Sequence, residues 1–232
     1  MQGVILAGGL ATRLQPLTDA VAKSMVDIRG KPFLEYQLEL FKKNGVEDVV
    51  LCVGHLADQI RARFGDGAAF GVRIRCSDDG ARPMGTAGAL KKAETLLSES
   101  FFVLDGDSYL PFDYRKIMTA FEAGGREALM VVHENHDRYD KSNAAVAGNQ
   151  VTVYDRARKT PGLVHIHAGL SVLRREALAS IPADRPSSQD ELWADLISRG
   201  QLTAFVEKGR FYEIGSPLGL TEFREHIGAN PC

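Results

Sequence analysis

A glycine-containing turn with a fixed positive charge follows the first apolar run of the chain. Residues 1–7 read Met-Gln-Gly-Val-Ile-Leu-Ala, and two glycines come directly after them. Two glycines allow a tight turn and lack the Cβ atoms that would block a ligand, so the backbone N–H groups can converge on an anion. Thr12 adds a hydroxyl, Arg13 adds a planar donor fork suited to phosphate oxygens, and Lys23 adds a second charge. We therefore expect a polyphosphate site at the carboxyl end of this strand.

The same turn also has a purely structural interpretation, because a strand followed by two glycines is an ordinary turn in many α/β proteins. The P-loop pattern Gly-x-x-x-x-Gly-Lys-Ser/Thr is absent from the chain, and so is the dinucleotide pattern Gly-x-Gly-x-x-Gly. The second apolar strand ends at Val53-Gly54-His55 rather than at an acid for a ribose. An NAD-dependent oxidoreductase is therefore a weak alternative, and a nicotinamide-cofactor titration would test it.

Two carboxylates end a later apolar segment. Asp105-Gly106-Asp107 follows the strand-like run Phe-Phe-Val-Leu at 101–104. Carboxylates at a strand tip beside a phosphate loop suit Mg²⁺, which binds one or two protein carboxylates together with substrate oxygens. A solvated turn is the alternative, and we expect it for Asp105 more than for Asp107.

A second group of small residues begins a predicted helix. Residues 85–90 read Gly-Thr-Ala-Gly-Ala-Leu, and small side chains at a helix start leave room for a flat ligand against exposed N–H groups. A close contact between the helix and the sheet would require the same residues. The loop alone leaves both interpretations open.

Length and composition indicate one globular domain, 1–232, that positions these groups. The chain has 232 residues, of which 44% are hydrophobic and 25% charged, with a formal net charge of -2. No block of like charge implies nucleic acid or a membrane surface, and no apolar run reaches membrane-span length. The N-terminus lacks the pattern of a signal peptide. Cys52, Cys76 and Cys232 are few and far apart, and we expect the first two to be buried thiols in a cytoplasmic protein.

Hydrophobic periodicity predicts alternating strands and helices. Because strand, helix and strand alternate at the start, we expect an α/β, Rossmann-like, doubly wound and mainly parallel sheet with helices on both faces. Active sites in that architecture lie beyond the carboxyl ends of the strands. The predicted strands are residues 1–7, 46–53, 72–76, 101–104, 128–132, 165–170 and 202–206, and the predicted helices are 31–43, 57–64, from 85 onward, 114–123, from the 187–188 cap to 198, and 217–227.

Residues 133–160 form a polar, irregular stretch with a predicted hairpin around Gly148-Asn149. Its many side-chain donors suit a small β lid over a sugar phosphate, and they equally describe an ordinary solvated flap. We therefore divide the domain into a nucleotide-binding half, 1–132, and a sugar-phosphate-binding half, 133–232. The polar side chains in the stretch are Arg138, Lys141, Asn143, Tyr154, Asp155, Arg156, Arg158 and Lys159.

The order of these motifs resembles the sugar-phosphate nucleotidylyltransferases. Residues 6–18 read Leu-Ala-Gly-Gly-Leu-Ala-Thr-Arg-Leu-Gln-Pro-Leu-Thr and resemble the family signature Leu-Ala-Gly-Gly-x-Gly-Thr-Arg-Leu-x-Pro-Leu-Thr. The Gly-Asp at 106–107 and the Glu-Ile-Gly at 213–215 match further family elements in the same order. The chain departs from the family pattern at Ala11, at Ala22 and Ser24 on either side of Lys23, at His167 in place of asparagine and at Glu213 in place of aspartate.

The resemblance implies a Mg²⁺-dependent enzyme that makes a nucleoside diphosphate sugar and pyrophosphate from a nucleoside triphosphate and a sugar 1-phosphate. Heptose-1-phosphate guanylyltransferases are the most similar subgroup in appearance, which favours GTP, and N-acetylmuramate-1-phosphate uridylyltransferases are the runner-up. We expect a monomer or homodimer. A catalytically silent nucleotide or sugar-phosphate sensor stays open because of the departures above. The implied site residues are Arg13 and Lys23 for catalysis, Leu6, Ala7, Gly8, Gly9, Ala11, Thr12, Gly85, Thr86 and Ala87 for the nucleotide, Asn143, Lys159, His167 and Gly169 for the sugar phosphate, and Asp107 and Glu213 for the metal.

Overall fold

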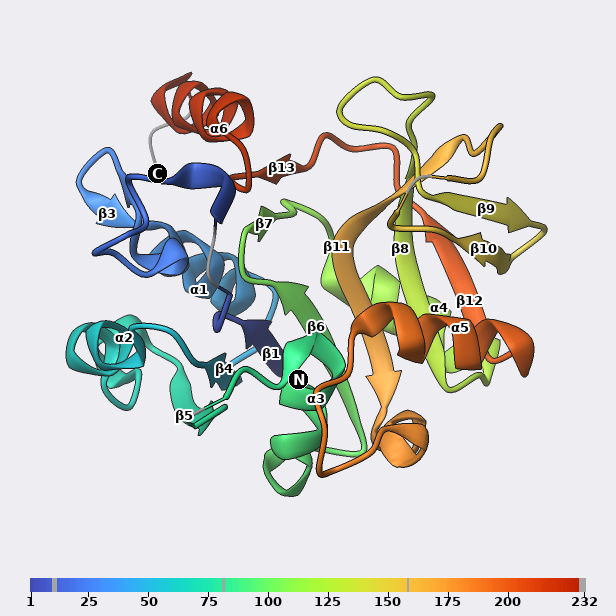
Figure 1. Ribbon diagram of the computed structural model, residues 1–232, viewed down its shortest axis with the longest axis horizontal. Coiled ribbons are helices and arrows are strands. Elements are labelled where there is room, and N and C mark those ends of the chain that lie inside the picture. The colour runs from blue at the N-terminus through green and yellow to red at the C-terminus, as the bar shows by residue number, and fades with distance from the viewer. Residues whose placement is uncertain (10–11, 81, 158, 230–232) are drawn as a thin grey trace.

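The computed structural model describes residues 1–9, 12–80, 82–157 and 159–229, without the side chain of Thr12. A nine-stranded sheet runs through the described chain (Figure 1). Its order is β5 (Arg73–Asp78), β4 (Asp48–Val53), β1 (Gln2–Leu6), β6 (Ser100–Asp105), β11 (His165–Arg174), β8 (Ala128–Glu134), β12 (Leu202–Val206), β10 (Gln150–Tyr154) and β9 (Ala144–Ala147).

The sheet is mixed, so the expectation of a mainly parallel sheet is wrong. Strands β5, β4, β1 and β6 are parallel to one another, and β8 is parallel to β12. The long strand β11 is antiparallel to both β6 and β8, and the β9–β10 hairpin adds antiparallel pairs at the edge. The predicted boundary between residues 132 and 133 falls inside β8. The β9–β10 hairpin predicted around Gly148 is present and extends the sheet.

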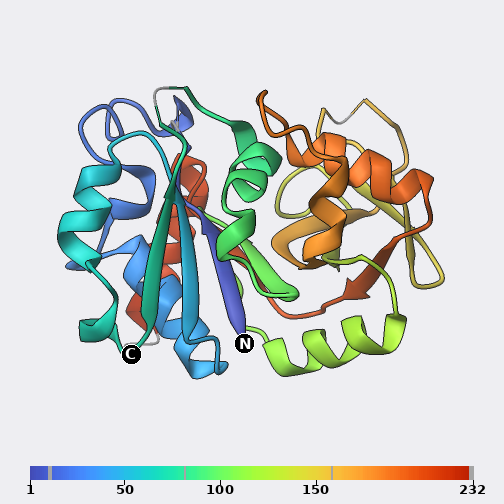
Figure 2. The same ribbon diagram turned by 90° about the horizontal axis from the view of Figure 1, so that it is seen from below.

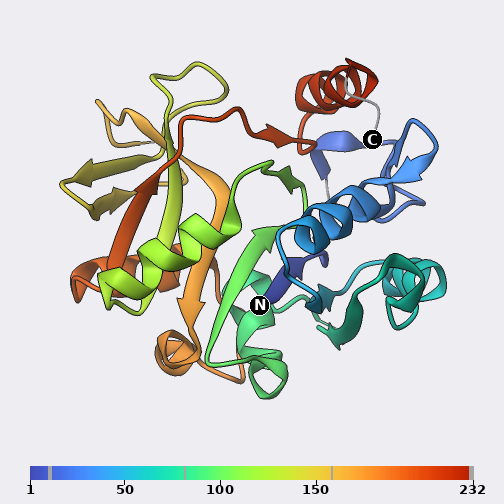
Figure 3. The same cartoon turned by 180° about the vertical axis from the view of Figure 1, so that it is seen from behind.

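Helices cover both faces of the sheet, as the alternating pattern predicts. Helices α1 (Phe33–Lys43), α2 (Ala57–Phe64) and α4 (Tyr114–Gly124) pack on one face, with α1 and α4 in front in Figure 3. Helices α3 (Gly85–Lys92) and α5 (Gln189–Ser198) pack on the opposite face, as Figures 1 and 2 show. Among the described residues, no helix combines the length and the apolar character needed to cross a bilayer.

Local sequence explains where several helices begin. The side chain of Ser188 accepts a hydrogen bond from the backbone N–H of Glu191, and the Glu191 side chain accepts one from the Ser188 N–H, which is a capping box at the start of α5. The Asp113 carboxylate accepts from two backbone N–H groups at the start of α4. Cys52 is buried as expected, whereas Cys76 is half-buried near the end of the edge strand β5.

A third group of elements lies beyond the carboxyl ends of the central strands. The short strands β7 (Ser108–Tyr109) and β13 (Tyr212–Glu213) pair antiparallel, and β2 (Asp27–Ile28) pairs with β3 (Lys31–Pro32). Helix α6 (Pro217–Ala229) follows β13, and its Phe223 ring contacts Phe33 on α1 with centroids 5.2 Å apart. Because β7 directly follows β6, the β7–β13 pair brings the distant residues 107 and 213 together.

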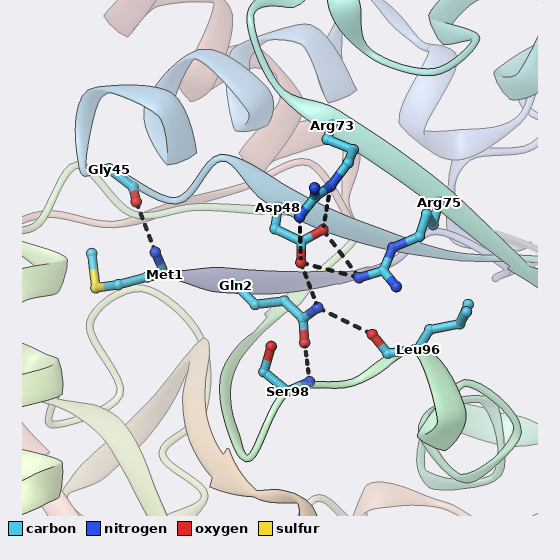
Figure 4. Close-up of polar contacts among 8 residues, drawn as sticks. All are labelled: Met1, Gln2, Gly45, Asp48, Arg73, Arg75, Leu96 and Ser98. Carbon is cyan, nitrogen blue, oxygen red and sulfur yellow. Dashed lines mark hydrogen bonds and ion pairs between the residues drawn. The ribbon is translucent and has the colours of Figure 1, made fainter.

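The opposite, amino-terminal end of the parallel strands is closed by a polar network (Figure 4). The buried Gln2 amide donates to Asp48 at 2.9 Å and to the Leu96 carbonyl at 3.1 Å. The Nη2 atoms of Arg73 and Arg75 lie 3.3 Å and 3.0 Å from Asp48 Oδ2. Burial alone would raise the pKa of Asp48, but the hydrogen bonds of Arg73 and Gln2 and the charge of Arg75 outweigh it, so the pKa is lowered. This network fixes the strand ends remote from the site.

Candidate active site

A polar pocket lies beyond the carboxyl end of β6 and the amino end of the antiparallel strand β11, and Arg13, Asp107 and Glu213 meet at its wall. A Cβ atom built on Gly215 would lie 2.8 Å from Arg13 Nη2, from Asp107 Oδ2 and from Glu213 Oε2. The absence of a side chain at Gly215 therefore leaves room where these three charged groups converge. Arg13 lies on a 3₁₀ turn, Thr12–Leu14, directly after the glycine turn.

Lys23 joins this group through an ion pair with Asp107. It begins the 3₁₀ turn Lys23–Met25 and is mostly shielded from solvent, with 17% of its side chain exposed. Burial would raise the pKa of Asp107, but Lys23 and Arg13 outweigh it and the pKa is lowered. Asp107 is therefore an anion held between two cations.

The other two carboxylates of this wall are less well compensated. Burial and the charge of Asp107 raise the pKa of Glu213, whose Oε1 accepts a hydrogen bond from Ser216 Oγ at 3.2 Å. Burial and Asp107 raise the pKa of Asp105 to about 7. The solvated turn expected for Asp105 is wrong, because Asp105 is the last residue of β6, lines the pocket and is half-buried.

The donor set at Gly215 fits a divalent cation shared with a ligand. Asp107 and Glu213 present carboxylate oxygens to one point. Among the described residues, no group of three or more acidic, histidine or cysteine side chains could hold a metal by protein ligands alone. Two protein carboxylates completed by substrate oxygens are the usual environment of Mg²⁺ at phosphate sites. The longer arm of Glu213 reaches the same point as Asp107 does.

The glycine turn lies against the end of β4. The Ala7 N–H donates to the Cys52 carbonyl at 2.8 Å, and a Cβ on Gly8 would lie 3.2 Å from the Gly54 nitrogen. A Cβ on Gly9 would meet no atom within 4 Å, so Gly9 faces open space. Leu6 ends β1 beneath this turn. Ala11 and the side chain of Thr12 fall outside the described part of the chain.

The Gly85-Thr86-Ala87 segment begins α3, and the Ala87 N–H and the following Gly88 N–H already have a partner. Gly85 has φ +72°, and a Cβ there would lie 2.5 Å from the Ser187 carbonyl oxygen. That oxygen accepts hydrogen bonds from Ala87 and Gly88 at 3.0 Å, and Thr86 Oγ1 accepts one from the Gln189 N–H at 2.7 Å. This end of α3 therefore packs tightly against the start of α5, and the three residues do not line the pocket at Arg13.

The predicted sugar side contributes three of its four residues to the pocket. Asn143 Oδ1 accepts the His167 N–H at 2.9 Å, which fixes the start of β11. Gly169 has φ +93°, where glycine is required, and a Cβ there would overlap the Ser108 side chain. Burial, with a smaller contribution from Arg156, lowers the pKa of His167 to about 4, so its ring is neutral near pH 7. Lys159 is exposed and lies away from the pocket lining.

Comparison of this sequence with models of known protein families identifies its family. The model described as Nucleotidyl transferase matches residues 2–143, which include the glycine turn, Lys23 and Asp107. The chain belongs to the nucleotidyl transferase family. The resemblance inferred from the motifs is confirmed at the level of the family.

Relatives of this nucleotidyl transferase include guanylyltransferases of two sizes. It is 31% identical over 223 residues to the mannose-1-phosphate guanylyltransferase catalytic subunit beta of Xenopus tropicalis, covering 94% of this chain but 62% of that protein. It is 29% identical to the D-glycero-alpha-D-manno-heptose 1-phosphate guanylyltransferase of Campylobacter jejuni, covering 96% of this chain and 98% of that one. The solved structure of HddC from Yersinia pseudotuberculosis complexed with GMP-PN superposes with a TM-score of 0.82 at 27% identity, over 97% of this chain and 99% of that chain.

Several residues that the motifs did not assign also line the pocket of this nucleotidyl transferase. Arg156 lines the pocket where Lys159 was expected, although the sequence offered it as one donor among many. Arg210 was not anticipated, since no motif contains it. Its guanidinium lies 3.7 Å from the ring centroid of Tyr139 and pairs with Glu222. Tyr139, Tyr154 and Phe211 complete an aromatic part of the lining.

Proposed function

We propose that the protein is a sugar-1-phosphate nucleotidylyltransferase that forms a nucleoside diphosphate sugar and pyrophosphate. GTP and a heptose 1-phosphate are the substrates we favour. The observation that carries the proposal is the convergence of Arg13, Lys23, Asp107 and Glu213 at one wall of a pocket. The full-length match to a heptose-1-phosphate guanylyltransferase supports the choice of substrates.

The proposed reaction requires positioning and charge neutralisation rather than a general base. An oxygen of the sugar phosphate attacks the α-phosphorus in line, the bond from that phosphorus to the β-phosphate bridging oxygen breaks, and pyrophosphate leaves with the electron pair. The nucleophile is already an anion at neutral pH. The enzyme must therefore bring two mutually repelling anions together and stabilise the charge that gathers at the α-phosphate.

The cations of the pocket wall are suited to this work. Arg13 would bind phosphate oxygens beside the glycine turn, whose Gly8 and Gly9 would hold the triphosphate. Lys23 would lie between the α-phosphate and the incoming sugar phosphate. Mg²⁺, held by Asp107 and Glu213, would supply further positive charge to the α-phosphoryl oxygen. Since Lys23 pairs with Asp107 in this structure, its ammonium lies beside the proposed Mg²⁺ position and could reach the α-phosphate oxygens bound there.

The remaining contacts divide between base and sugar. The start of α3 would present a flat surface of small residues to the base and ribose; two of its N–H groups already donate to Ser187, so shape rather than hydrogen bonding would select the ligand. Arg156 would neutralise the sugar phosphate in place of Lys159, because it lines the pocket. His167, uncharged near neutral pH, and Asn143 would border the sugar ring.

Pyrophosphate release measured for four nucleoside triphosphates against several sugar 1-phosphates tests the proposal. We expect Arg13→Ala to lower turnover by at least roughly a hundredfold, since a preorganised charge at the transition state is lost. Asp107→Asn should abolish most of the Mg²⁺-dependent rate. Arg126→Ala is the matched control, because Arg126 is exposed and far from these residues in the fold.

The possible outcomes separate the alternatives. Near-normal turnover in Arg13→Ala would refute the assignment of the pocket. Tight binding of a triphosphate or sugar phosphate without pyrophosphate release from any pair would instead support a silent sensor. Turnover with UTP and N-acetylmuramate 1-phosphate alone would replace the favoured substrates within the same reaction.

A further inference from the structure

Asp105 is a pocket carboxylate to which the reaction above gives no role. It is the last residue of β6, and its side chain lies on the α3 and α5 face of the sheet, since the preceding Leu104 packs on the other face. It lines the pocket together with Arg156 and His167. A Cβ on Gly169 would lie 3.6 Å from the Asp105 Cβ and would overlap the Ser108 side chain, so β11 passes this carboxylate with bare backbone and Ser108 lies beside it.

The hydrogen-bonding capacity of this carboxylate is largely unused. Within the described residues, its side chain takes part in no ion pair at 4.0 Å or less. The Gln189 amide on α5 lies close enough to Asp105 for a hydrogen bond that lowers the pKa of the carboxyl group, and the amide nitrogen has no other acceptor in that part of the chain. Gln189 is only 5% exposed, so it cannot turn to water. A carboxylate can accept more than one hydrogen bond, so a ligand hydroxyl on the pocket side could also donate to Asp105.

The charges around Asp105 define the class of ligand. Of the described residues that line the pocket, five are acidic and three are arginines. Arg210 is paired with Glu222, and Arg13 lies at the wall of Asp107 and Glu213. Arg156 lies close enough to Asp105 for its charge to lower the pKa of that carboxyl group, and it would be needed by the sugar phosphate. Among the described residues, the part of the pocket that would enclose the sugar ring therefore has no cation available for a second anionic group.

We propose that Asp105 is a specificity-determining residue that accepts hydrogen bonds from ring hydroxyls of the sugar, so that the pocket selects neutral, polyhydroxylated sugar 1-phosphates over sugars with a further anionic substituent. The inference rests on the proposed function and narrows its sugar substrate. A site built to bind a hydroxyl rejects analogues that lack it, because its own polar groups are then left unpaired.

A panel of monodeoxy sugar 1-phosphates tests the proposal. The values of kcat/KM are measured for the preferred sugar and for its deoxy analogues with the wild-type enzyme, Asp105→Ala and Asp105→Leu. In the wild type, we expect at least one deoxy analogue to lose roughly ten- to a hundredfold. For the same analogue we expect Asp105→Ala to lose less than about threefold relative to its own parent sugar, because the acceptor is already gone. Asp58→Asn on the exposed face of α2 is the matched control and should keep wild-type selectivity.

A second arm tests the charge of the pocket. N-acetylmuramate 1-phosphate and glucuronate 1-phosphate carry an extra carboxylate, and we expect the wild type to use each at least roughly tenfold less well than its neutral parent. Circular dichroism and thermal melting of each variant establish that it is folded, and Asp105→Leu, which has a similar branched shape and no acceptor, replaces the alanine variant if that variant does not fold.

Each result decides a separate question. If Asp105→Ala or Asp105→Leu, which both lack an acceptor, keeps the full discrimination against every deoxy sugar, the role of Asp105 is refuted. A drop in kcat/KM with 2′-deoxynucleoside triphosphates but not with deoxy sugars would also refute it, because Asp105 would then bind the ribose. Use of the anionic sugars at the neutral rate would refute the charge argument. Absence of pyrophosphate release from every substrate pair with the wild type would instead overturn the proposed function itself.

Discussion

Acidification should destabilise the fold through His167 at the start of the central antiparallel strand. The ring is held by Ser171 Oγ at 3.1 Å from Nε2 and by the edges of Tyr154 and Trp193, with centroids 6.1 and 6.2 Å away. Burial lowers its pKa from 6.5 to about 4. Since the folded pKa lies below the unfolded one, the unfolded chain binds a proton first, and stability falls as the pH drops from about 6.5 towards 4.

The size of the effect follows from the distance between the two pKa values. At pH 5 the solution lies about 1.5 pH units below the unfolded pKa, and each unit corresponds to about 1.4 kcal/mol, which gives about 2 kcal/mol. The ring borders the pocket and is partly open to water, so we expect about 1 kcal/mol from this residue after screening. Urea unfolding at pH 8 and pH 5 measures the loss for the wild type and for His167→Asn.

The comparison between the two proteins isolates this residue. Burial also lowers the pKa of His165 and His226, so the wild type and the variant share those contributions and only the difference between their pH dependences counts. His167→Asn should lose about 1 kcal/mol less than the wild type between pH 8 and pH 5. Equal losses in the two proteins would show that His167 is protonated in the folded state or freely solvated, and the reasoning would be refuted.

Three further predictions concern backbone fit and the remote network. Asp48→Asn should lower the free energy of unfolding at pH 7 by about 1 kcal/mol, and because its folded pKa is lowered, the gap from the wild type should close as the pH falls below about 4; a gap that persists at pH 2 would contradict the ion-pair explanation. Gly169→Ala should cost about 2 kcal/mol or more in urea unfolding, since φ is +93° and the new Cβ overlaps Ser108; a loss under 0.5 kcal/mol would show that the strand can relax. Gly215→Ala should leave the melting temperature within a few degrees of wild type but lower pyrophosphate release at least roughly tenfold, because the Cβ would lie 2.8 Å from the ends of Arg13, Asp107 and Glu213; unchanged release would place the reacting groups elsewhere.

The elements with strong local signals could be predicted from sequence, and the arrangement of the strands could not. Helix α2 matches the expected 57–64, and the turn at Gly148 forms the expected hairpin, because turn residues and periodicity act locally. The antiparallel direction of β11 depends on the path of the chain between β10 and β11, which carries no periodic signal. Pairing partners are set by tertiary packing, so a run of apolar residues gives a strand but not its neighbours.

The candidate site shows the same division. Motif order identified Arg13, Lys23, Asp107 and Glu213. The β7–β13 pairing brings Asp107 and Glu213 together, and Arg13 and Lys23 reach them from two 3₁₀ turns. The sequence predicted a solvated Asp105, because nothing local indicates that α5 packs beside it. Helix α5 begins more than 80 residues later in the chain. The position of Arg210 depends on stacking against Tyr139, and neither residue belongs to a motif.

Strand β11 limits how this molecule can move. It is hydrogen-bonded along one edge to β6 and along the other to β8, so the described strands on its two sides belong to one continuous sheet. Any tightening around reactants must come from groups that rise above the sheet edge, such as the turn at Arg13, the residues before β9 and the start of α6. We therefore expect hydrogen exchange to slow on ligand addition in those segments, while the amides of β6, β11 and β8 stay equally protected throughout.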